Sequence, residues 1–105
     1  MLAQLGYTVI IPARPGLESE AEGTKKAITA ACEGAKLIVP AVGLNLGSLA
    51  SVKEFAATIN SSQERIDLLC MNAGRGGGAN DPREETGDGL EAIMQVIRCA
   101  QLYEI

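Results

Sequence analysis

The sequence predicts an α/β fold with a parallel sheet, and two observations lead to that prediction. Apolar, strand-like segments alternate with amphipathic, helix-like segments in the order strand, helix, strand, helix, strand, helix. This alternation is typical of a parallel sheet whose faces are covered by helices. The chain has 105 residues, of which 47% are hydrophobic and 21% charged, so the composition fits one modest globular domain.

The first strand and helix occupy the N-terminal third of the chain. Residues 7–13 are apolar and β-branched, and Pro12 and Pro15 close the segment, which predicts a buried strand. Residues 18–33 predict a helix, with Gly34 as its C-terminal stop. The apolar face of this helix is expected to contain Ala21, Ile28, Ala31 and Cys32.

The second strand and helix follow. Residues 36–42 predict a strand that contains Pro40. Because proline cannot donate a ladder hydrogen bond, we expect this strand at a sheet edge. Either Ser48 or Ser51 can cap the helix predicted over residues 48–62. The i, i+3, i+4, i+7 spacing of an amphipathic helix is formed there by Val52, Phe55, Ala56 and Ile59.

The last strand and helix flank a glycine-rich loop. Residues 66–71 form an apolar run that predicts a third strand. Residues 88–103 predict a third helix, with Asp88 and Glu91 suited to its N-terminus. The apolar face of this helix is expected to contain Leu90, Ile93, Ile97 and Ala100.

Residues 74–79 have the G-x-G-x-x-A spacing of a dinucleotide-binding loop. Such a loop must open directly onto a helix whose N-terminal N–H groups hold the pyrophosphate. Here turn residues and an acidic cluster follow instead, which disfavours a phosphate site. We prefer a second interpretation, in which Asn72, Ala73 and Gly74 lie at a strand tip and border a ligand. The third interpretation is a glycine loop that contacts no ligand.

Composition limits the partners and the chemistry. The net charge of -4 and the pI of about 4.7 argue against nucleic acid, which needs a concentrated basic face. The chain has no histidine and no cysteine pair with zinc-ligand spacing, so no metal site is predicted. No membrane span and no signal peptide are predicted. Buried free thiols in a reducing compartment are the preferred interpretation of Cys32, Cys70 and Cys99.

Four segments resemble the short-chain dehydrogenase/reductase family, and they occur in the family's order. They are GYTVIIPAR (residues 6–14), LNLGSLASVKEFA (44–56), RIDLLCMNAG (65–74) and TGDGLEAIMQV (86–96). The pattern is nearest the subgroup that includes retinol dehydrogenases and protochlorophyllide reductases. The resemblance implies a partial Rossmann-like doubly wound sheet of three strands and three helices. It also implies an NADP(H)-dependent oxidoreductase that transfers hydride to a carbonyl or from an alcohol.

The resemblance implies that residues 1–105 are a single incomplete NAD(P)-binding domain. The family's first strand and phosphate loop would lie before Met1, and its catalytic serine and Tyr-x-x-x-Lys beyond Ile105. No catalytic residue is therefore assigned, and the chain is expected to be inactive alone. In the family's sheet the missing first strand lies between the second strand, which residues 7–13 match, and the fourth, which residues 66–71 match. We therefore expect a marginal fold, or direct pairing of residues 7–13 with residues 66–71.

The resemblance also implies cofactor-binding residues. Arg14 matches the arginine that contacts the adenosine 2′-phosphate in NADP-preferring members, and no acid there competes for the ribose hydroxyl. A solvated strand-end charge is the alternative for Arg14. Asn45 stands where the family has an aspartate near the adenine amino group, and its amide oxygen can still accept that hydrogen bond. Leu46 would contribute its backbone. The adenosine-side strand tip is matched by Asn72, Ala73 and Gly74.

Two alternatives remain open. The first is a non-catalytic remnant that binds a nucleotide or a protein, with self-association through unpaired strand edges. Ile97 favours it, because many family members have an asparagine there that supports the active-site water chain; a core position on a helix is the preferred interpretation of Ile97. Met71 also replaces a usual asparagine. The second is a complete flavodoxin-like domain, which needs a phosphate loop or acidic pocket that residues 12–20 do not supply.

Overall fold

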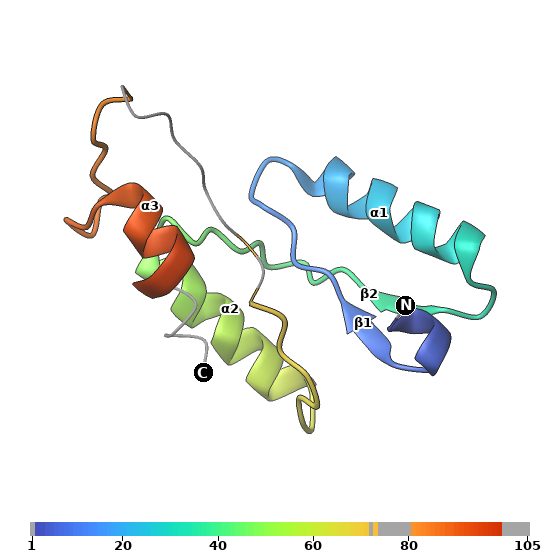
Figure 1. Ribbon diagram of the computed structural model, residues 1–105. Coiled ribbons are helices and arrows are strands. Elements are labelled where there is room, and N and C mark those ends of the chain that lie inside the picture. Colours follow the sequence, from blue (N-terminus) through green and yellow to red (C-terminus); the bar gives the residue numbers. More distant parts are fainter. Residues whose placement is uncertain (1, 72, 74–80, 100–105) are drawn as a thin grey trace. The chain divides into compact units, whose positions relative to one another are not determined.

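The computed structural model describes residues 2–71, 73 and 81–99. The predicted α/β class is confirmed, because these residues form a parallel sheet together with helices. The chain divides into two compact units, Met1–Leu44 and Asn45–Ile105, and each has its own secondary structure. In Figure 1 the first unit runs from blue to green and the second from green to red.

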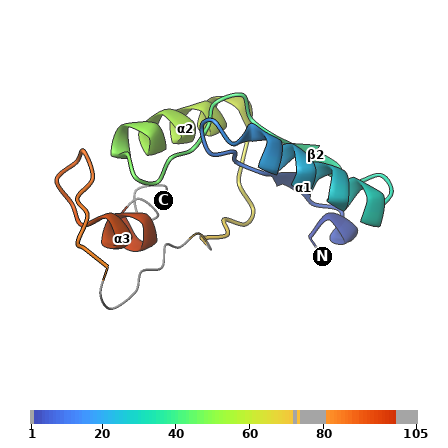
Figure 2. The same ribbon diagram turned by 90° about the horizontal axis from the view of Figure 1, so that it is seen from above.

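The first unit contains two parallel strands joined by a helix. Strand β1 (Thr8–Ile10) pairs with strand β2 (Lys36–Ile38). The backbone N–H of Ile11 also donates to the carbonyl of Ile38 at 2.8 Å, which continues the ladder by one bond. Helix α1 (Glu18–Ala31) connects the strands and runs beside them in Figure 1, and in the view from above it lies over β2 (Figure 2).

Proline and glycine set the limits of these elements. Strand β2 ends before Pro40, so the predicted strand over residues 36–42 is too long at its C-terminal end. Gly34 turns the chain after α1 with a φ of 77°, which confirms the predicted stop at a residue that tolerates this backbone. The buried face of α1 includes Ala21, whereas Ala31 is exposed, so one member of the predicted face is wrong.

The second unit contains helix α2 (Leu49–Ser62), which matches its prediction closely. The Ser48 side chain accepts a hydrogen bond from the backbone N–H of Ser51 at 3.3 Å, so Ser48 is the N-cap of the two candidates. Val52 is fully buried. The rest of the predicted apolar face is half-buried and consists of Phe55, Ala56 and Ile59.

The last helix begins later than predicted. Helix α3 (Ala92–Met94) continues as a π-helical turn, Gln95–Cys99, and the predicted extension to residue 103 lies outside the described residues. The Glu91 carboxylate caps the start, because it accepts from the N–H groups of the second and third helical residues at 3.1 and 2.8 Å. Gln95 is buried, whereas Ile97 is 39% exposed, so the predicted core role of Ile97 is wrong.

The predicted third strand over residues 66–71 does not form, and the sheet of the described residues has two strands rather than three. Four apolar side chains in this segment are exposed, namely Ile66 (49%), Leu68 (55%), Leu69 (44%) and Met71 (46%). An apolar run becomes a strand only when a neighbouring backbone completes its hydrogen bonds. No strand in the described part of the chain pairs with this run, so the direct pairing considered above is absent there.

The exposure of this segment also corrects the interpretation of the cysteines. Cys70 is exposed rather than buried, because it belongs to the apolar run that does not join the sheet. Cys32 is half-buried at the end of α1, and both thiols are free.

The exposure of residues 66–71 can be tested with a single thiol. In the double variant Cys32→Ser, Cys99→Ser, the remaining Cys70 thiol should react with a disulfide reagent within about tenfold of its rate in denaturant, since local opening of an exposed segment costs almost nothing. The measurement is the absorbance of the released thiolate under native and denaturing conditions. Protection by several orders of magnitude would show that the segment is buried in the protein.

Candidate functional site

The loops that follow β1 and β2 lie against each other at the carboxyl ends of the two parallel strands. The backbone N–H of Leu44 donates to the carbonyl of Ala13 at 2.8 Å. A Cβ atom on Gly43 would come within 3.0 Å of the Pro15 ring and 3.2 Å of the Ala13 carbonyl, so the close approach requires glycine there. Ligands of open α/β sheets bind at this edge of the sheet.

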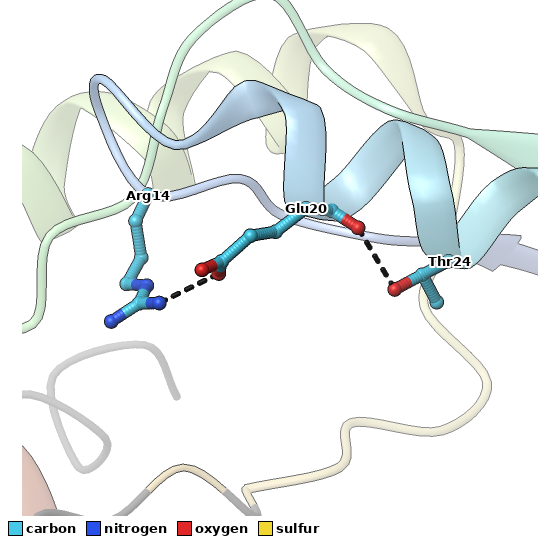
Figure 3. Close-up of polar contacts among 3 residues, drawn as sticks. All are labelled: Arg14, Glu20 and Thr24. Atoms are coloured by element: carbon cyan, nitrogen blue, oxygen red, sulfur yellow. Dashed lines mark hydrogen bonds and ion pairs between the residues drawn. The ribbon is translucent and has the colours of Figure 1, made fainter.

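Arg14 stands at this edge with an exposed side chain and a carboxylate partner. Its guanidinium donates to the Glu20 carboxylate at 2.6 Å, and the two side chains are 65% and 59% exposed. Figure 3 shows this pair, together with the Thr24 hydroxyl that donates to the Glu20 backbone carbonyl at 3.0 Å. Sequence analysis did not identify Glu20 as a partner of Arg14. The acid was missed because Glu20 is six residues away along the chain and is brought back by the first turn of α1.

A second carboxylate occupies the same loop. The Glu18 carboxylate accepts from the backbone N–H of Gly16 at 3.1 Å. Hydrogen bonds from its own backbone N–H and from that of Gly16 lower the pKa of the Glu18 carboxyl below its ordinary value. The first turn of α1 therefore carries two acids, Glu18 and Glu20, and Glu20 is the one paired with Arg14. An exposed ion pair of this kind is worth about 0–1 kcal/mol, so a doubly charged anion can replace Glu20 on Arg14.

Asn45 and Leu46 lie together in the turn that leads into α2. The Asn45 side-chain oxygen accepts from the backbone N–H of Gly47 at 2.9 Å, and the Asn45 backbone N–H donates to the Ser51 hydroxyl at 3.0 Å. Asn45 is exposed. Because an amide oxygen has two lone pairs, it can accept a second hydrogen bond from a ligand amino group.

The Leu46 carbonyl is held by a buried glutamine that sequence analysis did not identify. Gln95 is fully buried, and its Nε2 group donates to the Asp88 carboxylate at 2.9 Å and to the Leu46 carbonyl at 3.4 Å. Its Oε1 atom accepts from the Thr86 hydroxyl. Because a carboxylate and a carbonyl only accept, these partners define which side of the amide carries the nitrogen.

Asp88 links this glutamine to the start of α2. Its carboxylate accepts from the backbone N–H of Leu49, the first residue of α2, at 2.9 Å. The hydrogen bond from Leu49, followed by that from Gln95, lowers the pKa of the Asp88 carboxyl below its ordinary value. Together with Ser48, Asp88 occupies N–H groups at the α2 N-terminus that would otherwise attract an anion.

The other predicted site residues are only partly described. Ala73 is exposed, whereas Asn72, Gly74 and the glycine loop over residues 74–79 lie outside the described residues. Arg14 belongs to the first unit, and Asn45 and Leu46 belong to one turn of the second. No group of three or more potential metal-ligating side chains occurs among residues 2–71, 73 and 81–99, and no helix in that part of the chain has the length and apolar character to cross a membrane.

Comparison with known proteins finds no match, either among protein-family models, among curated proteins or among solved structures. The resemblance to short-chain dehydrogenases is therefore a property of the four sequence segments alone.

The Asp88 hydrogen bonds predict a pH-dependent effect of Asp88→Asn. Because the folded pKa is depressed, the carboxylate stabilises the fold above its unfolded pKa of about 3.9, and this contribution disappears as the pH falls through the lower folded pKa. Thermal unfolding should therefore show Asp88→Asn less stable than the parent at pH 7, with the difference shrinking below about pH 4. The amide oxygen could still accept both hydrogen bonds, which reach the same carboxylate oxygen, but without the negative charge that strengthens them.

Asp67→Asn is the matched control, since it removes the same charge from an exposed ion pair with Arg65 at 2.9 Å. It should change the midpoint little, as expected for a surface pair. Equal destabilisation by the two substitutions at pH 7, or a loss in Asp88→Asn that is independent of pH, would contradict the assigned role of Asp88.

Proposed function

We propose that this chain is the adenosine-binding part of an NADP(H)-dependent short-chain oxidoreductase, in which β1 and β2 are neighbouring strands of a Rossmann-like sheet. The observation that carries the proposal is the exposed Arg14 at the carboxyl end of a parallel β–α–β unit. In dinucleotide-binding folds the cofactor lies at this edge, and an arginine there accommodates the 2′-phosphate of NADP. A guanidinium can bind phosphate through two parallel hydrogen bonds.

Each assigned residue has a separate binding role in this proposal. The Arg14 guanidinium exchanges the Glu20 carboxylate for the 2′-phosphate. The Asn45 side-chain oxygen accepts from the adenine amino group, and the Leu46 backbone borders the base. The resemblance also assigns Asn72, Ala73 and Gly74 to the adenosine side, and Asn72 and Gly74 lie outside the described residues. When bound, the nicotinamide supplies hydride chemistry toward a carbonyl or alcohol substrate. The residues assigned here bind the cofactor, and none is assigned a catalytic role.

Substitution of Arg14 tests this proposal most directly. Arg14→Ala should weaken NADPH binding by about tenfold or more, because it removes charge-assisted hydrogen bonds to phosphate. NADH, which has no 2′-phosphate, should be unaffected. The dissociation constants can be measured from the fluorescence of the bound reduced nicotinamide.

Arg83→Ala is the matched control, because Arg83 is also an exposed arginine in an ion pair, with Glu85 at 3.3 Å. It removes the same charge without touching the proposed site. An equal loss of NADPH affinity in both variants, or an equal loss of NADH affinity in Arg14→Ala, would show a general charge effect and contradict the proposal.

Glu20 gives an independent prediction with the opposite sign. Glu20→Gln should strengthen NADPH binding by about two- to fivefold, because it removes an exposed carboxylate that competes with phosphate for Arg14. Glu22→Gln, two residues along the same helix, is the control for net charge. If the two variants bind NADPH equally well, the Arg14–Glu20 ion pair does not regulate access of phosphate to the arginine.

A protein-binding module is the second candidate, and the exposed apolar run over residues 66–71 favours it. Such a run, which pairs with no strand of the described residues, could add as a strand to another chain. Under this alternative, sedimentation equilibrium should show concentration-dependent association that Leu68→Lys abolishes. A monomer at every concentration would contradict self-association through this segment.

A further inference from the structure

We propose that Gln95 is a positioning residue for adenine recognition, acting on Asn45 through a single peptide plane. The inference depends on the proposed function, because it assumes that Asn45 accepts a hydrogen bond from the adenine amino group. Gln95 is not one of the residues assigned to contact the cofactor, so the inference adds a supporting residue to that site.

The first argument is the burial of Gln95. Gln95 and Val52 are the largest side chains that are fully buried among the described residues, and only Gln95 is polar. A buried amide is costly unless its hydrogen bonds are made. Both sides of this amide are engaged, since Nε2 donates to the Asp88 carboxylate and the Leu46 carbonyl and Oε1 accepts from the Thr86 hydroxyl. Because this buried amide has all its partners, it holds together the segments that carry them.

The second argument is the peptide that joins Leu46 to Gly47. Its carbonyl belongs to Leu46 and accepts from Gln95, whereas its N–H belongs to Gly47 and donates to the Asn45 side-chain oxygen at 2.9 Å. The peptide bond is planar, so its carbonyl and its N–H cannot turn independently. By holding one end of this plane, Gln95 determines the direction in which the other end holds the Asn45 oxygen.

The third argument is that the same network holds the turn at its far end. Asp88 accepts from Gln95 and also from the backbone N–H of Leu49, where α2 begins. Both ends of the short segment from Leu46 to Leu49 are therefore tied to residues 86–95, a segment about forty residues further along the chain. Loss of Gln95 releases the peptide plane, and the Asn45 oxygen loses its defined direction toward a base.

The test compares two cofactors that differ only at the base. NADPH has the adenine amino group, and its hypoxanthine analogue has a carbonyl in that position, which cannot donate to Asn45. The full chain should prefer NADPH by about two- to tenfold, the value of one net hydrogen bond. In Gln95→Met, which has a similar shape but no amide, the ratio of the two dissociation constants should fall to about one. Gln63→Met, at the C-cap of α2, should keep the parent ratio.

The ratio separates positioning from general damage to the fold. If Gln95→Met weakens both cofactors equally and leaves their ratio unchanged, Gln95 is only structural and the inference is overturned. If the parent chain binds both cofactors equally well, Asn45 does not read the amino group, which also overturns it. If the parent chain binds neither, the proposed function itself fails, and that outcome is distinct from the other two.

A second measurement covers the case in which Gln95→Met does not fold. Thr86→Val removes the hydroxyl that donates to Gln95 and accepts from the backbone N–H of Asp88. Amide hydrogen exchange then reports on the peptide plane directly, without any cofactor. The Gly47 amide should exchange faster in Thr86→Val than in the parent, while amides in the middle of α2 keep their rates. An unchanged rate at Gly47 would contradict the link between this network and the Asn45 turn.

Discussion

The hydrogen bonds of the buried Gln95 amide are the interaction on which the second unit depends. They join Thr86, Asp88 and Leu46, and through Asp88 they reach the first N–H of α2. Apolar burial around them is small, because the buried hydrophobic residues described in this unit are one valine and one alanine. A buried amide without partners is costly, so the loss of these hydrogen bonds would destabilise the unit.

The first unit is stabilised by different interactions. Its two strands hold each other through a short parallel ladder, and its buried hydrophobic residues are Ala13 and Ala21, which remove little apolar surface from water. A lone pair of strands is marginal in water. At the carboxyl ends of the strands, Arg14 forms an exposed ion pair with Glu20. Arg14 can exchange Glu20 for another anion at little cost in free energy.

Local signals made the helices predictable. Serine capping and apolar spacing defined α2 to within one residue, and Gly34 marked the end of the α1 segment. The third strand was predicted wrongly, because the hydrophobicity of residues 66–71 is a local property whereas a strand needs a partner elsewhere in the chain.

The candidate site was predictable only in part for the same reason. Arg14, Asn45 and Leu46 were assigned to it through the family resemblance. Glu20 and Gln95 were missed, because their roles depend on a helical turn and on a contact across 49 positions of sequence. An acid in the first turn of a helix that follows an arginine was the available signal for Glu20. For Gln95 the only hint was its spacing of three from Ala92, on the face of α3 that is buried.

The central claim is that Arg14 and the Asn45 turn bind the adenosine half of NADP(H). The most direct measurement is a titration of the isotopically labelled full chain with adenosine 2′,5′-bisphosphate, followed by the chemical shifts of its backbone amides. The account predicts saturable shifts at residues 14–16 and at residues 45–47, and little change in the C-terminal half of α2. No saturable shift at either segment, or shifts confined to other parts of the chain, would contradict it.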